Sequence, residues 1–190
     1  MHERNRDSSP AQNAGFGMTE RNRVCAIARS WLGTPYHHMG RIKGVGVDCA
    51  MFPLEVYREA GLIGDVEIPF YPQDWMLHRS EEIYLRIVQQ HAAETEPAAT
   101  GSPTRPGVGV DGVKVAAGDF VLYRFGRCWS HGAIVLEWPL IIHAVVQHGV
   151  ILSNGETDGM LVGRRKRTFK LNVTKDYYWK KHQWKGRRGE

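Results

Sequence analysis

The sequence predicts an α+β domain in which N-terminal helices pack on a central antiparallel β-sheet. Apolar residues recur at helical spacing in the first half of the chain and form short, strand-like runs after Gly118. Helices first and strands afterwards is the order typical of this fold class. The chain has 190 residues, of which 42% are hydrophobic, and this is enough for one domain with a substantial core.

Three helices are expected in the first half of the chain. They span residues 23–32, 49–60 and 80–93, and the serine that opens the third helix is its expected N-cap. Pro53 removes a hydrogen bond that the Cys49 carbonyl would otherwise accept. The second helix should therefore start late or bend in its first turn.

Short strands are expected in the second half, and they should build the sheet. We expect residues 19–173 to form the domain, with a loop insertion at 94–117, between a disordered extension at 1–18 and a basic tail at 174–190. The expected strands cover residues 120–123, 132–136, 140–146, 150–152, 161–162 and 168–173.

Composition narrows the classes of protein. The first residues are polar and lack the apolar core of a secretory signal, and no run reaches the length of a membrane span. The three cysteines are an odd number without CxxC spacing, which argues against a disulfide framework and a structural zinc site. We expect synthesis in the cytoplasm, no signal peptide, no metal and no cofactor.

Basic charge is concentrated at the C-terminus. Residues 164–190 hold 11 Lys and Arg and two acidic residues, a net +9, which leaves residues 1–163 at −4 within the chain's +5. Tyrosines and tryptophans interleave with these basic residues, as they do in some nucleic-acid-binding segments. A solvated surface strand or tail explains the same pattern equally well.

Cys49 is the candidate nucleophile. Asp48 precedes it and can accept hydrogen bonds from the first amides of the second helix, as an N-cap does. The helix dipole favours negative charge at this end, so the Cys49 thiol is expected to ionise more easily than a free thiol.

Two histidines supply a candidate base and a group to orient it. His131 and His143 are 12 residues apart on two expected neighbouring strands. A hairpin centred on Glu137 would place them directly opposite each other on one face of the sheet. One imidazole could then accept the thiol proton while the other fixes its orientation, as in a catalytic triad.

These motifs, in this order, resemble the NlpC/P60 cysteine peptidases, a papain-like family that cleaves peptide bonds of bacterial cell-wall peptidoglycan. The resemblance covers residues 24–149. It consists of a helix ending in WLGTPY, a glycine-bearing loop, the motif GVDC, a GDFVLY strand, and SHGAIVLEWPLIIHA.

The resemblance implies a papain-like fold and a set of site residues. The catalytic set falls on Cys49, His131 and His143, which would act through an acyl-enzyme. Tyr36 falls on the family tyrosine near the oxyanion and substrate, and Asp48 is grouped with it on that side of the site. Peptidoglycan stem peptides are the implied substrate partners.

The chain also departs from the family pattern. Family members usually follow the cysteine with Ser-Gly, where this chain has Ala50 and Met51, and Gly-Gly after the tyrosine is reduced to Met39-Gly40. The segment FYPQDWMLHRSEEIYL resembles members associated with phage and prophage tails. This implies a phage or prophage origin, tail proteins as partners, and a virion or tail location from which the protein acts on the cell wall.

Other readings remain open. Cys25 and Cys128 are expected to pack as small hydrophobic side chains. His37 and His38 could bind a metal with Cys49, but they are expected in a surface loop. Besides the cell-wall hydrolase, two functions remain: a phage tail assembly protein with little activity, and a nucleic-acid-binding protein that uses the basic tail.

Overall fold

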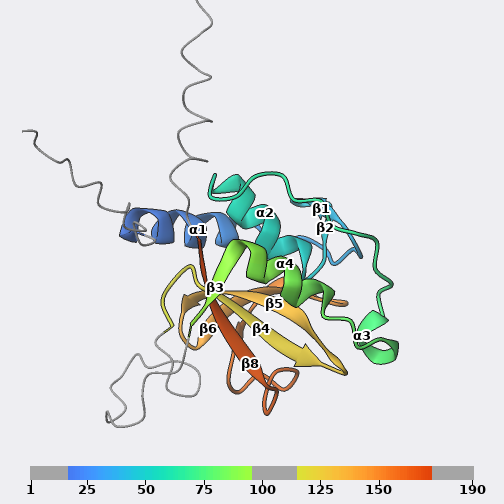
Figure 1. Ribbon diagram of the computed structural model, residues 1–190. Coiled ribbons are helices and arrows are strands. Elements are labelled where there is room, and N and C mark those ends of the chain that lie inside the picture. The colour runs from blue at the N-terminus through green and yellow to red at the C-terminus, as the bar shows by residue number, and fades with distance from the viewer. Residues whose placement is uncertain (1–16, 96–114, 173–190) are drawn as a thin grey trace, which may run out of the picture.

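The computed structural model describes residues 17–95 and 115–172 and has a layer of helices on a six-stranded antiparallel sheet (Figure 1). The predicted α+β class is confirmed. The helices are α1 (Met18–Ser30), α2 (Met51–Glu59), α3 (Trp75–His78) and α4 (Ile83–His91). The strands are β1 (Arg41–Ile42), β2 (Gly46–Val47), β3 (Ala92–Glu94), β4 (Phe120–Phe125), β5 (Cys128–Glu137), β6 (Leu140–Val145), β7 (Gly149–Asn154) and β8 (Lys166–Leu171).

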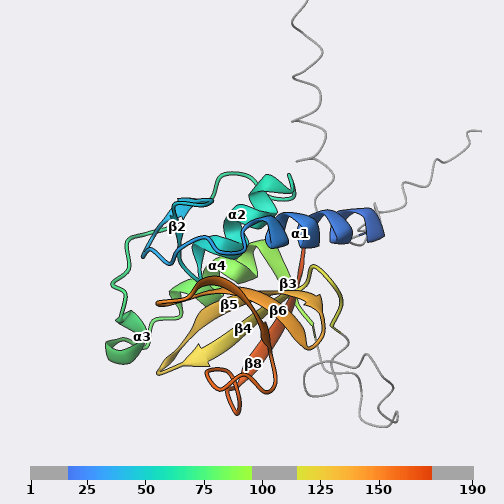
Figure 2. The same ribbon diagram turned by 180° about the vertical axis from the view of Figure 1, so that it is seen from behind.

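The large sheet has the strand order β3-β8-β4-β5-β6-β7, and β1 and β2 form a separate two-stranded sheet. Helices α1, α2 and α4 lie on one side of the large sheet, and α3 lies apart from them near the end of β4 and β5 (Figures 1 and 2). The amide of Arg127, in the turn between β4 and β5, donates to the Met76 carbonyl of α3 at 2.9 Å. No helix within the described residues is long and apolar enough to cross a membrane.

Several predicted elements differ from the structure. The third helix is shorter than expected: it starts at Ile83, and its last predicted residues belong to β3 instead. Ser80 is therefore not its N-cap. Residues 161–162 form a turn rather than a strand. The Leu161 side chain in this turn is fully buried. The predicted basic tail, and most of the predicted extension and loop insertion, lie outside the described residues.

The sheet is buried on both faces, which explains its continuous apolar strands. Leu122, Ile134 and Ile142 face the helices, where they join the main core with Phe52 and Val56 of α2. The neighbouring strand positions point to the opposite face and form a second cluster. That cluster contains Val121, Tyr123, Ala133, Val135, Ile141 and Leu161.

Helix α2 begins at Met51, two residues later than predicted, as the proline in its first turn suggested. Pro53 has no amide to donate to the Cys49 carbonyl. The Tyr84 hydroxyl of α4 donates to that carbonyl instead, at 3.1 Å. A side chain of another helix thus replaces the missing backbone bond and ties α4 to the start of α2.

Gly132 of β5 leaves room for this Tyr84 hydroxyl. A Cβ atom at position 132 would lie 2.1 Å from Tyr84 Oη and 2.7 Å from the Phe120 ring. Real side chains do not approach so closely, so the ring and hydroxyl would have to move. The absence of a side chain at Gly132 therefore allows α4 to hold the turn that carries Cys49.

We predict that Gly132→Ala destabilises the protein by about 1–3 kcal/mol, because the added methyl overpacks a filled site. The free energy of unfolding in urea measures this. Gly159→Ala is the matched control: nothing lies within 4 Å of its added Cβ, and the cost should stay within about 0.5 kcal/mol. Equal stabilities for the two variants would show that Gly132 has no packing role.

Candidate active site

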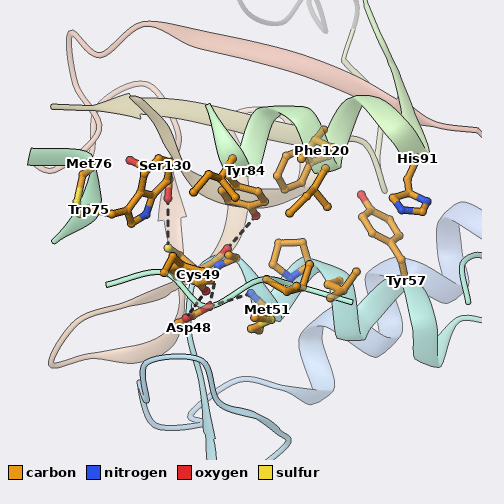
Figure 3. Close-up of a pocket in the computed structure, with 18 of the residues that line it drawn as sticks. Asp48, Cys49, Met51, Tyr57, Trp75, Met76, Tyr84, His91, Phe120 and Ser130 are labelled. Atoms are coloured by element: carbon orange, nitrogen blue, oxygen red, sulfur yellow. Dashed lines mark hydrogen bonds between the residues drawn. The ribbon is translucent and has the colours of Figure 1, made fainter. Parts of the chain in front are cut away.

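Asp48 organises the turn that carries the candidate nucleophile. Its carboxylate is buried, and its Oδ1 accepts from the amides of Ala50 at 3.0 Å and Met51 at 2.9 Å (Figure 3). Its Oδ2 accepts from the Met39 amide and the Tyr71 hydroxyl, each at 2.7 Å. The predicted hydrogen bonds to the first amides are found, although the N-cap position of α2 is Ala50 and Asp48 lies in the turn before it. The same carboxylate also holds two segments outside the helix.

Cys49 lies in this turn, with its sulfur against β5. Its Sγ donates to the Ser130 carbonyl at 3.5 Å (Figure 3). No hydrogen bond joins Cys49 to His131 among the described residues, although both line the same cleft. Catalytic hydrogen bonds are often long or absent in active sites without substrate.

The pKa of Cys49 is raised, which is the reverse of our prediction. The residue is half-buried but protein atoms surround its sulfur, and this burial is the main cause. The nearby Asp48 carboxylate raises the pKa further, while the amides of Gly132 and of Cys49 itself lower it. The helix start therefore does not by itself make a thiolate here.

His131 and His143 form a hydrogen-bonded pair. Nε2 of His131 lies 2.7 Å from Nδ1 of His143, with the rings nearly perpendicular. Nε2 of His143 lies 3.0 Å from Oγ of Ser153 on β7. All three side chains are buried at the wall of the cleft.

The predicted hairpin register is wrong, but the predicted shared face is right. The turn lies at Trp138 and Pro139, where Glu137 pairs with Leu140, and a β-bulge between Val135 and Glu137 changes the register by one residue, so that Ile134 pairs with Ile142 rather than with Leu140. His143 is thus displaced from His131 by two positions. Because side chains alternate with a period of two, an even shift keeps both histidines on one face.

Both imidazoles are held neutral. Burial lowers the pKa of His131 well below its usual value, and the neighbouring His143 and Arg164 lower it further. Burial also lowers the pKa of His143 to about 4, although Asp158 opposes this shift. A neutral imidazole has one donor and one acceptor nitrogen. The remaining nitrogen of His131 can therefore either accept or donate a hydrogen bond, depending on which tautomer is present.

Only one tautomer arrangement leaves a base facing the cleft. If His131 donates from Nε2 to His143, its Nδ1 is free to accept a proton, and His143 must then donate from its own Nε2 to Ser153. Ser153 is a residue that sequence reasoning missed. Ser153 on β7 pairs with Ile141 of β6, two positions before His143. A correct prediction of this register would have placed Ser153 on the same face of the sheet as His143.

These residues line an open cleft of about 820 Å³. Tyr36 stands beside Cys49 on its wall, and burial raises the pKa of the Tyr36 hydroxyl, which keeps it protonated as a donor. Gln73, Asp74, His148 and Asp158 are further polar residues that line the cleft. The structure thus gathers the predicted Cys49, His131, His143 and Tyr36 around one cleft, with Asp48 behind the wall.

The two histidines of the loop do not gather with Cys49 into a metal site. Nε2 of His38 lies 2.8 Å from the Tyr71 carbonyl oxygen, and Nδ1 of His37 lies 3.0 Å from the His38 carbonyl oxygen. In the described part of the chain, no three His, Cys, Asp or Glu side chains lie close enough to hold a metal ion.

Comparison with known proteins points to one family. The model of the NlpC/P60 family matches residues 33–188. The fold is similar to NlpC1 from Trichomonas vaginalis, at 14% identity and a TM-score of 0.54, over 87% of this chain and 47% of that one. An NlpC/P60 family protein from Bacillus cereus matches at 18% identity and a TM-score of 0.50, over 81% of this chain and 40% of that one.

The NlpC/P60 domain of the peptidoglycan hydrolase SagA matches at 18% identity and a TM-score of 0.47, over 77% of this chain and 96% of that one. The chain therefore spans nearly all of the SagA domain but less than half of the other two proteins. No curated protein sequence matches this chain.

The raised pKa of Cys49 predicts slow alkylation at neutral pH. In a Cys25→Ala/Cys128→Ala background, the iodoacetamide rate should keep rising with pH beyond pH 8, because deprotonation is disfavoured until then. The rate is measured by mass spectrometry over time. A plateau already reached at pH 6 would instead show a stable thiolate–imidazolium pair and contradict the neutral site.

Proposed function

The chain belongs to the NlpC/P60 family, and from that premise we propose that it is a cysteine peptidase or amidase that hydrolyses peptide bonds of bacterial cell-wall peptidoglycan. The family includes peptidoglycan hydrolases. The observation that carries the proposal is the buried His131–His143 hydrogen bond at 2.7 Å, in the cleft that also holds Cys49.

In the proposed reaction, Cys49 Sγ attacks the carbonyl carbon of the scissile amide while its proton passes to Nδ1 of His131. The negative charge on the carbonyl oxygen is stabilised by the Cys49 amide and by the Tyr36 hydroxyl at the cleft wall. His131 then donates the proton to the leaving amine, which leaves a thioester. Water, activated by His131, hydrolyses the thioester and restores the thiol.

His143 acts as the orienting residue in this scheme. Its Nδ1 accepts from His131 and stabilises the imidazolium that forms after proton transfer, while Ser153 holds the outer nitrogen of His143. Because the Cys49 pKa is raised and the His131 pKa is lowered, proton transfer is uphill in the free protein. We propose that the Cys49 thiolate forms only when substrate is bound, because substrate binding makes deprotonation of the thiol favourable.

We further propose a phage or prophage origin, with tail proteins as partners and action at the cell wall. Its support is the resemblance of residues 70–85 to tail-associated members of the family. This segment contributes Tyr71, Trp75, Met76 and Tyr84 to the surroundings of Cys49. The nucleic-acid alternative depends on the basic tail, which lies outside the described residues.

Cys49→Ala should lower the rate of peptidoglycan hydrolysis by roughly 10³-fold or more, because alanine cannot form the thioester. New amino groups released from purified peptidoglycan measure the rate. Cys25→Ala is the control, since Cys25 is also half-buried but contacts the Val135 carbonyl at 3.7 Å, away from the cleft. Equal rates for Cys49→Ala and the parent would overturn the proposed nucleophile.

The orienting role of His143 predicts an order among its variants. His143→Asn and His143→Gln keep a hydrogen-bond acceptor and should retain more activity than His143→Ala, which should lose about 10²-fold in kcat. Ser153→Thr should likewise retain more activity than Ser153→Ala, because it keeps the hydroxyl. If all three His143 variants matched the parent, His143 would lie outside the catalytic set.

A further inference from the structure

A second cavity adjoins Cys49, and neither His131 nor His143 lines it. It lies between α2 and α4, has a volume of about 100 Å³, and shares Tyr36, Cys49 and Ser130 with the cleft. Its walls are mostly aliphatic and aromatic, and they include Leu54, Ile87 and Val88 from the two helices. The candidate nucleophile thus stands where the open cleft that holds the two histidines meets a smaller and more apolar cavity.

The cavity is elongated. Its lining residues run between α2 and α4 from Cys49 and Ser130 at one end to Tyr57 and His91 at the other (Figure 3). At the ~10–15 Å³ that one enclosed water requires, the volume holds roughly seven to ten water-sized groups. An unbranched chain fits this shape better than a compact, branched side chain does.

Three tyrosine hydroxyls of the cavity wall already have partners within the protein. The Tyr57 hydroxyl donates to the Gly118 carbonyl at 3.0 Å, and the Tyr84 hydroxyl donates to the Cys49 carbonyl. The Tyr71 hydroxyl is held by Asp48. Because these hydroxyls are engaged and most of the wall is apolar, a charged ligand would recover few hydrogen bonds for the hydration it loses, whereas an apolar chain has no hydrogen bonds with water to replace.

We propose that this cavity binds a linear, medium-length aliphatic acyl chain and that Cys49 accepts acyl groups of this class from esters. This is an activity beyond peptidoglycan hydrolysis, and it rests on the proposed function only in using the same nucleophile. The chain lies between α2 and α4 with its carbonyl carbon at Cys49, and the leaving group occupies the cleft beside His131.

The chemistry follows the same steps as amide hydrolysis. Cys49 Sγ forms a bond to the acyl carbon, the carbon–oxygen bond of the ester breaks, and His131 carries the thiol proton to the departing oxygen. Water then attacks the thioester, which releases the fatty acid and restores the thiol. No oxidant or further reactant is needed.

The test compares p-nitrophenyl esters of acetate, butyrate, hexanoate, octanoate and decanoate with the intact protein. Each added methylene should raise kcat/KM about fourfold until the cavity is full, as burial of apolar surface predicts. Val88→Phe shortens the cavity and should lower the octanoate-to-acetate ratio at least about tenfold. Gln89→Phe, on the exposed side of the same helix, should keep the parent ratio.

A flat chain-length profile would overturn the acyl-chain proposal, as would faster reaction of the N-acetyl-leucine ester than of the hexanoate ester. If Val88→Phe fails to fold, Val88→Ala decides the question: the wider cavity should move the optimum to a longer chain, and an unmoved optimum contradicts the proposal.

Direct binding separates this proposal from the proposed function. Sodium octanoate is titrated calorimetrically into the Cys49→Ala protein and its Val88→Phe derivative. Binding that Val88→Phe weakens, in a protein whose parent hydrolyses neither esters nor peptidoglycan, would support the acyl-chain site but overturn both the ester reaction and the proposed hydrolase. Peptidoglycan hydrolysis without octanoate binding would overturn the cavity's proposed ligand alone.

Discussion

The buried carboxylate of Asp48 is the interaction on which the site depends. A charge removed from water is costly unless hydrogen bonds replace its hydration. Here the replacement comes from three segments: the Met39 amide of the glycine loop, the Tyr71 hydroxyl of the connector, and the amides that open α2. The turn that carries Cys49 can hold its shape only while these segments are together. The same charge makes the neighbouring thiolate harder to form.

Much of the site depends on backbone groups that a side chain must satisfy. Pro53 leaves the Cys49 carbonyl without its helical donor, and the Tyr84 hydroxyl of a distant helix supplies one. That hydroxyl fits only because Gly132 presents no side chain. Three residues far apart in sequence therefore set the one turn that carries Cys49.

The sequence predicted the fold class, the late start of α2 and the shared face of His131 and His143, because these follow from local patterns of period and capping. It could not predict the hairpin register, since the place of the turn between Glu137 and Leu140 and the bulge beside it are decided by packing of the whole sheet. For the same reason Ser153 was missed. The pKa of Cys49 was predicted with the wrong sign because the helix-end effect is local, whereas burial depends on everything that covers the sulfur.

The neutral histidine pair also couples the site to proton uptake on unfolding. An unfolded histidine has a pKa near 6.5, whereas that of folded His143 is about 4. Between these values the unfolded chain binds protons that the folded protein excludes, so acid favours unfolding and stability is lost as pH falls from about 6.5 to about 4. For His143 alone the loss amounts to about 3 kcal/mol, a large part of the stability of a domain this size. The arrangement that keeps His131 ready to accept a proton thus sets an acid limit on the conditions in which the domain can remain folded.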